Sequence, residues 1–206
     1  MSENPLCMAE TEEGAPGWDA IEAAFRGLYP AQAPPRYFGT SGGEPPNSCV
    51  WGVSAYRAPA RWHLVTLGLS ELWAKQSDQP DTSGWGFELT IRLPRGDRET
   101  EPPGWAVKLL KVVGDSVYRT GKPLAEGSRL DIGAPITMPL ISNLEALALT
   151  RDSELPILQT PNGRVEFLLV LGIRRDQLEQ MQASSTDEVL DRLQESNPHL
   201  LTDPGR

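Results

Sequence analysis

The side chains that could do nucleophilic or acid–base chemistry are few and scattered in this sequence. It contains two histidines, His63 and His199, and two cysteines, Cys7 and Cys49. A cysteine nucleophile would need one of these histidines beside it, yet all four residues stand in unrelated sequence contexts. The Gly-x-Ser-x-Gly motif of serine hydrolases and the Walker phosphate-binding motif are absent. The sequence therefore gives little support for nucleophilic or phosphate chemistry.

The same residues predict neither a metal site nor a disulfide. A zinc site needs cysteine or histidine ligands at recognisable spacing, and the two histidines and two cysteines do not supply it. Cys7 falls in a segment that we expect to be loose, which argues against a structural disulfide. We therefore expect no metal and no cofactor.

His63 and Glu88 remain as candidates for acid–base chemistry. A lone histidine on an apolar strand is more often a hydrogen-bonded core residue than a catalyst. Glu88 could pair with Arg92 or, across a hairpin, with His63. A small hydrolase using His63 and Glu88 is therefore one of two hypotheses, and a binding module is the other. An open cleft holding both residues would favour the hydrolase, and burial with satisfied partners would favour the module.

Two predicted strands carry these candidates. Every second residue from Phe87 to Leu93 is apolar and the residues between are polar, which predicts a half-buried strand over 86–93. The stretch 62–69 is rich in large apolar and β-branched residues and predicts a second strand. We expect the two strands to form a hairpin across the polar loop 74–83.

Gly84 and Gly86 bracket Trp85 at the start of the later strand, where the backbone must turn or pass close to another segment. Trp85 is therefore predicted to be either a partly exposed aromatic residue beside a mobile loop or a structural residue that covers the end of the sheet. Buried aromatic anchors contribute a large share of interface energy. We expect a partner to bind near Trp85 and the loop 74–83.

The remaining elements come from apolar periodicity and capping signals. Helices are predicted over 17–28, over 103–119, over a short segment at 174–182 and, with Ser185 and Glu188 as a capping box, to about 194. The apolar stripe expected for the 103–119 helix consists of Trp105, Leu109, Val112, Val113 and Val117. The segment 144–149 fits either a helical turn or a strand.

The pair Asn162-Gly163 predicts a tight type I′ turn, because both positions of that turn need positive φ. It would join strands at 155–160 and 164–173, the second of which is apolar throughout 167–171 and should be central in a sheet. Strands and helices alternate without a regular βαβ rhythm. We therefore expect one α+β domain over 17–206, with a mixed, largely antiparallel sheet packed against helices, after a disordered leader over 1–16.

The charge balance favours a protein partner over nucleic acid. The chain has 28 acidic and 19 basic residues, a net charge of −9, whereas nucleic-acid binding depends on neutralising phosphates with basic residues. An acidic surface suits a basic protein but is also common in soluble proteins. No apolar run approaches the roughly 20 residues of a membrane span, and the N-terminus does not look like a signal peptide. We expect a cytoplasmic protein that binds neither nucleic acid nor membrane.

The two strands resemble a known family. Arg61-Trp-His-Leu-Val-Thr-Leu-Gly-Leu-Ser-Glu-Leu-Trp73 and Ser83-Gly-Trp-Gly-Phe-Glu-Leu-Thr-Ile-Arg-Leu93 are similar to the Suppressor of fused family, and further similarity runs in order from about 17 to 203. The resemblance implies a protein-binding α+β domain that is not an enzyme. Within it we assign partner binding to Trp62, His63, Trp85 and Glu88.

The resemblance also indicates which kind of partner to expect. Animal members sequester transcription factors with two lobes that close over a peptide, and this chain resembles only the N-terminal lobe. A Tyr and an Asp that help grip the peptide correspond here to Ser116 and Ser128. Single-lobe bacterial relatives include proteins that look like immunity proteins for secreted toxins. A bacterial immunity protein that neutralises a basic toxin is therefore the specific role that the resemblance suggests.

Overall fold

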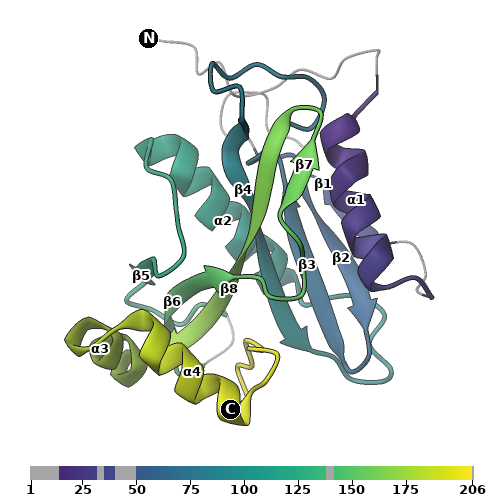
Figure 1. Ribbon diagram of the computed structural model, residues 1–206. Helices are drawn as coiled ribbons and strands as arrows, with labels where there is room; N and C mark the ends of the chain where they lie inside the picture. Colours follow the sequence, from purple (N-terminus) through teal and green to yellow (C-terminus); the bar gives the residue numbers. More distant parts are fainter. Residues whose placement is uncertain (1–13, 32–34, 40–49, 138–141, 206) are drawn as a thin grey trace.

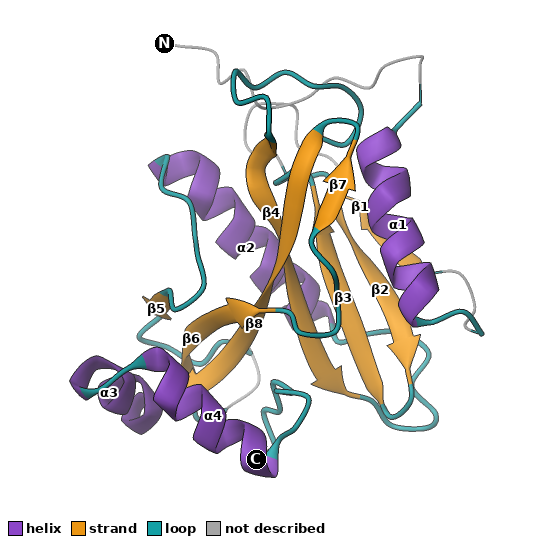
Figure 2. Cartoon of the chain, in the orientation of Figure 1, coloured by secondary structure: helices purple, strands orange, loops and turns teal. Residues whose placement is uncertain are grey.

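A computed structural model describes residues 14–31, 35–39, 50–137 and 142–205. It contains one eight-stranded sheet and four helices (Figures 1 and 2). The elements, in chain order, are α1 Pro16–Leu28, β1 Arg36–Gly39, β2 Gly52–Ala58, β3 Arg61–Leu67, β4 Thr82–Pro94, α2 Gly104–Thr120, β5 Arg129–Asp131, β6 Leu144–Arg151, β7 Leu158–Thr160, β8 Gly163–Arg174, α3 Arg175–Ala183 and α4 Thr186–Ser196. The predicted leader lies outside the described residues except for 14–16, and Pro16 already belongs to α1.

The sheet is mixed, as predicted. Its strand order is β1-β2-β3-β4-β8-β6-β5, with β7 paired to β8 beyond this path. The predicted hairpin of β3 and β4 is antiparallel, with His63 opposite Arg92. The pairing of β4 with β8 is parallel, and all other pairings are antiparallel. The single α+β domain expected from the sequence is confirmed, and the ambiguous segment 144–149 is a strand.

Helices cover both faces of the sheet. On one face α2 packs over a cluster that includes Leu89 and Ile91 of β4. On the other face α1 covers β2 and β3 through Ile21 and Phe25, while α3 and α4 cover the β6 and β8 end of the sheet. The second face therefore carries two separate apolar clusters, and the polar side chains of β4 lie between them.

The prediction of a half-buried β4 is wrong. Every residue from Phe87 to Leu93 is buried, including Glu88, Thr90 and Arg92. Alternation of apolar and polar residues usually marks one wet face. Here the second face is covered by the loop after β6 and by the segment 197–203, whose backbone Thr202 N–H donates to the carbonyl of Arg92 at 2.8 Å.

The apolar stripe predicted for α2 is confirmed except at one position: Trp105, Leu109, Val113 and Val117 pack on the core cluster, and Val112 does not. The buried residues of α2 are Ala106, Leu110, Val113, Gly114 and Val117. Val112 is 52% exposed. Gly114 is buried in the same face: a Cβ atom there would lie 2.6 Å from Val50 Cγ2, so the absence of a side chain lets the helix approach Val50 closely.

The type I′ turn at Asn162-Gly163 is also wrong, although the hairpin exists. Thr160 pairs with Gly163, so the two loop residues are Pro161 and Asn162. Asn162 does not have a positive φ, whereas Gly163 has φ 113°. Proline fixes its own φ near −65° and cannot occupy a type I′ position. The pair Asn162-Gly163 therefore lies one residue later than the two-residue loop Pro161-Asn162.

Candidate functional site

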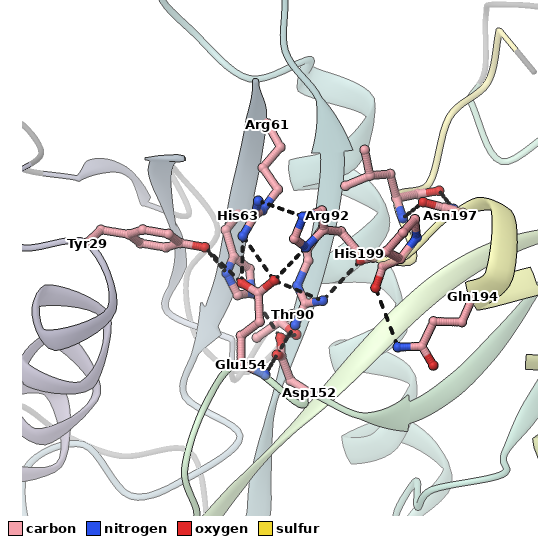
Figure 3. A network of polar contacts seen from close by, with 12 residues as sticks. Tyr29, Arg61, His63, Thr90, Arg92, Asp152, Glu154, Gln194, Asn197 and His199 are labelled. Carbon is pink, nitrogen blue, oxygen red and sulfur yellow. Dashed lines mark hydrogen bonds and ion pairs between the residues drawn. The ribbon is translucent and has the colours of Figure 1, made fainter. Parts of the chain in front are cut away.

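His63 lies inside the sheet and is hydrogen-bonded through both ring nitrogens. Its side chain is 0% exposed. The Nδ1 atom lies 2.9 Å from the hydroxyl of Tyr29, at the end of α1, and Nε2 lies 2.9 Å from Oδ2 of Asp152 (Figure 3). Because a carboxylate can only accept, Nε2 carries the proton, so in the neutral ring Nδ1 accepts from Tyr29, whose hydroxyl also lies 3.3 Å from Oε2 of Glu154. This arrangement fixes one neutral tautomer of the histidine.

Asp152 is the centre of the buried network. Besides His63, its carboxylate accepts from the Thr90 hydroxyl at 2.7 Å, from the Arg92 guanidinium, and from the backbone N–H of Glu154 at 3.0 Å. The side chains of Asp152 and Arg92 are 0% and 2% exposed. A buried ion pair of this kind is stable only when its remaining donors and acceptors are satisfied, and these contacts provide that.

The electrostatic environment keeps Asp152 ionised and His63 neutral. Burial by itself disfavours the charged carboxylate, but the hydrogen bond from His63 and the nearby Arg92 guanidinium lower the pKa of Asp152 below its usual value. Burial lowers the pKa of His63 and outweighs the opposing effect of Asp152. Burial also raises the pKa of Tyr29 to about 12. These groups are therefore held in fixed protonation states near neutral pH.

The outer end of the network attaches the C-terminal segment to the sheet. Glu154 accepts from Arg61 at 2.8 and 2.9 Å and pairs with His199 Nδ1 at 2.9 Å. Arg92 Nη1 donates to the backbone carbonyl of His199 at 3.0 Å. The side chain of Glu154 is 17% exposed, so the network reaches the surface only at this end (Figure 3).

Glu88 occupies a separate buried position. Its carboxylate accepts from the Thr66 hydroxyl at 2.6 Å, from the Ser70 hydroxyl at 2.7 Å, and from the backbone N–H groups of Gly68, Leu69 and Ser70. Glu88 is 0% exposed, and burial raises its pKa against the opposing effect of these donors. Its role in the fold is to hold the turn that follows β3.

These contacts answer the structural test between the two hypotheses. His63 and Glu88 bond to different sets of residues, and both side chains are buried with satisfied partners. A general acid or base must come within hydrogen-bond reach of its substrate, which neither side chain can do without opening the sheet. The geometry favours a binding module over the proposed hydrolase.

Trp62 is also interior, whereas Trp85 keeps part of its surface. Trp62 is 0% exposed and is flanked by the guanidinium groups of Arg57 and Arg95 at 5.6 and 5.8 Å from its ring. Trp85 is partly buried and packs edge-on against Tyr118 of α2, with ring centroids 5.6 Å apart. Of the four residues assigned to partner binding, Trp85 alone can touch a partner in this conformation.

The backbone around Trp85 follows the sequence prediction. Gly84 and Gly86 have positive φ values of 55° and 83°. A Cβ atom on Gly84 would lie 2.7 Å from the carbonyl oxygen of Leu69, and Trp85 N–H donates to that same oxygen at 2.9 Å. The indole Nε1 has no acceptor among the described residues, so packing alone holds the ring.

The loop 74–83 is tied down rather than loose. Glu71, 1% exposed, accepts from the backbone N–H groups of Gln76 and Ser77 at 2.6 and 2.5 Å and pairs with Lys75 at 3.1 Å. The backbone N–H of Gly84 donates to the same carboxylate at 3.1 Å. The loop therefore presents a fixed surface next to Trp85.

Sequence reasoning missed the central residues of the network. Asp152 lies 89 positions from His63, and no local pattern connects the two. Tyr29 follows the predicted helix 17–28 directly and carries no local signal for a contact with His63. The polar residues at alternate positions of β4 carried a signal, since Thr90 and Arg92 share a face with Glu88, but the pattern was taken to mean exposure.

The described residues contain neither a membrane-spanning helix nor a cluster of metal ligands. None of the described helices is long and apolar enough to cross a membrane. Within residues 14–31, 35–39, 50–137 and 142–205, no group of three or more His, Cys, Asp or Glu residues is arranged to hold a metal ion.

Sequence comparison identifies relatives over most of the chain. The profile of the family described as Suppressor of fused protein (SUFU) matches residues 47–206. The Suppressor of fused homolog of Homo sapiens is 30% identical over 213 residues, which cover 92% of this chain and 43% of that protein. The homolog of Mus musculus is 29% identical over the same shares. The chain thus spans less than half the length of these curated relatives.

Solved structures with the same fold belong to the same group. The crystal structure of the Sufu-Fu complex matches with a TM-score of 0.85 and 26% identity over 94% of this chain and 91% of that chain. Drosophila Suppressor of Fused matches with a TM-score of 0.85 and 27% identity over 95% of this chain and 51% of that chain. A SUFU homolog from Neisseria gonorrhoeae shares the fold alone, with a TM-score of 0.63 and 15% identity over 92% and 94% of the two chains. The profile match, the human relative and the shared fold together show that this chain belongs to the Suppressor of fused protein family.

Proposed function

We propose that this chain is a protein-binding module and not an enzyme, and that it binds its partner through the surface around Trp85 and the loop 74–83. One observation carries the proposal: the acid–base side chains His63, Glu88 and Asp152 are buried and fully engaged in internal hydrogen bonds. A group that cannot reach a substrate cannot catalyse its reaction. The function is therefore assigned to the surface.

The family supports a protein as the partner. A relative with the same fold forms the Sufu-Fu complex. Trp85 adds a local argument, because a partly exposed tryptophan on a fixed loop can be buried by a partner at little entropic cost. The hydrogen bonds of Glu71 keep that loop in place. In this proposal Trp62, His63 and Glu88 shape the surface from within.

The residues that correspond to the peptide grip of animal members favour a different partner. Ser116 Oγ donates to the carbonyl of Val113 at 2.6 Å, and Ser128 Oγ accepts from the N–H of Ala125 at 3.0 Å. Both short side chains bond to backbone groups three residues earlier in the chain. We propose a basic protein, with a secreted toxin as the specific case and immunity as the role, because the chain carries a net charge of −9.

The test uses capture followed by quantitative binding. The wild-type chain is used to capture a partner from the native cell or from co-expression with a neighbouring toxin-like gene, and the affinity is then measured for wild type, Trp85→Ala and Val112→Ala. Val112 is 52% exposed on α2 and serves as the control. Trp85→Ala should weaken binding by about 2 kcal/mol or more, whereas Val112→Ala should not. Loss of binding together with the thermal transition would make Trp85 a structural residue and overturn the assignment.

A further inference from the structure

A second feature lies at the opposite end of the sheet from the loop 74–83. A pocket of about 350 Å³ opens beside the C-terminal end of α4, next to the end of β8 and the segment 197–203. Ligand-sized pockets begin at roughly 300 Å³. Figure 1 shows α4 and the C-terminal segment beside the lower end of β8. The pocket shares no residue with the Trp85 surface and plays no part in the buried network.

The pocket has an apolar wall of four leucines facing polar and charged side chains. Leu144, Leu171, Leu193 and Leu201 line it, and the first two are only 6% and 3% exposed. Asn197 is fixed by two hydrogen bonds to the backbone of Leu201, both 2.9 Å. The pocket therefore exists without any rearrangement, and its walls can pack against an aliphatic chain.

The electrostatic balance at the pocket is negative. Helix α4 ends there without a basic residue in its last turn, so the partial negative charge of the helix C-terminus is not compensated by such a side chain. Asp203 lines the pocket; it accepts from the backbone N–H of Gly205 at 2.9 Å and forms no ion pair with a described residue. Arg174 also lines it, but its guanidinium bonds to both oxygens of Asp176 at 3.0 and 3.1 Å.

We propose that this pocket binds the cationic side chain of an arginine or lysine from a partner protein. The aliphatic part of that side chain would lie against the four leucines, and its charge would meet Asp203 and the C-terminus of α4. Two observations select a cation: the carboxylate of Asp203, which accepts from the backbone N–H of Gly205 and has no cationic partner among the described residues, and the helix end without a basic residue. The inference goes beyond the Trp85 surface, because it concerns a separate site and a defined chemical group.

A small probe tests the pocket without any partner protein. N-acetylarginine methylamide and N-acetyllysine methylamide, the latter acetylated only at its α-amine, are titrated into ¹⁵N-labelled full-length chain, and amide shifts are followed by NMR. The citrulline analogue is the neutral control of similar shape. Shifts should concentrate at Gly172, Leu193, Leu201 and Asp203 for the cationic probes and be absent for citrulline. Raising the salt concentration should weaken them.

Matched variants decide whether Asp203 is responsible. Asp203→Asn should raise the dissociation constant of the cationic probe about tenfold, since it removes a charged hydrogen-bond acceptor. Asp187→Asn, which removes an acidic residue from the first turn of α4, should leave the constant unchanged. Equal effects of the two variants, or equal binding of citrulline, would overturn the proposal. Arg206→Ala should also leave it unchanged, and a large gain in affinity would instead identify the chain's own arginine as the occupant.

Because the probe is independent of any partner, its failure would leave the Trp85 assignment intact. Conversely, the probe could bind the pocket while the Trp85→Ala variant keeps full affinity for the partner. That result would support the pocket and overturn the Trp85 surface. Each outcome therefore supports or overturns one statement at a time.

Discussion

Replacing Asp152 by asparagine should be among the most destabilising single changes in this protein. The variant removes a charge whose side chain is 0% exposed and leaves the guanidinium of Arg92, 2% exposed, without its carboxylate. Breaking a buried ion pair by removing one partner typically costs about 3–5 kcal/mol. The amide also replaces one acceptor oxygen by an NH₂ group. Either His63 and Thr90, which donate to Oδ2, or Arg92 and the Glu154 N–H, which donate to Oδ1, therefore lose their acceptor.

Urea denaturation followed by tryptophan fluorescence measures this loss as a change in the free energy of unfolding. Glu154→Gln is the matched control, because Glu154 belongs to the same network but is 17% exposed and should cost only about 1 kcal/mol. Adding Arg92→Met to Asp152→Asn should recover part of the loss, since no uncompensated buried charge remains. A cost for Asp152→Asn no larger than that of Glu154→Gln would refute the account of the network.

Three further predictions concern the apolar core, the buried histidine and the turn beside Trp85. Phe87→Ala should cost about 3–5 kcal/mol in the free energy of unfolding, because the ring is 2% exposed; an unchanged thermal transition would contradict its place in the core. Burial lowers the pKa of His63, so the unfolded chain binds a proton below about pH 6.5 that the folded chain does not. Wild type should therefore lose up to about 1.4 kcal/mol per pH unit relative to His63→Gln as the pH falls below that value, and parallel pH profiles would rule this out. Gly84→Ala should destabilise more than Gly127→Ala, because both have positive φ but only Gly84 lacks space for a Cβ atom; urea midpoints for the pair decide the matter.

Local patterns predicted the elements of this fold well. Alternation of apolar and polar residues predicted the strand β4, and the apolar run 167–171 predicted that β8 is central in the sheet. Ser185 predicted the start of α4, where its hydroxyl accepts from the Glu188 N–H at 3.1 Å. Such signals depend on neighbours in sequence, so they survive without tertiary information. The errors arose where a distant segment decides the outcome. Gly114, for example, is buried because α2 approaches Val50, far earlier in the chain, too closely to leave space for a side chain.

The candidate site was less predictable for the same reason. Trp85 and its flanking glycines have a local signature, and their backbone conformation was anticipated. The burial of Arg92 depends on segments that lie 60 or more residues later, around Asp152 and His199, whereas Glu88 is enclosed by the turn that follows β3. A strand with polar residues at alternate positions can face either solvent or a polar interior, and the sequence of that strand alone does not distinguish the two.

The most direct test of the central claim is hydrogen–deuterium exchange on the captured complex. If the surface around Trp85 binds the partner, amides of 74–86 should become protected in the complex, while those of β3 and β8 should exchange equally slowly in both states. The measurement compares the free chain with the complex at one pH and temperature. Protection confined to other faces, with unchanged exchange at 74–86, would contradict the account.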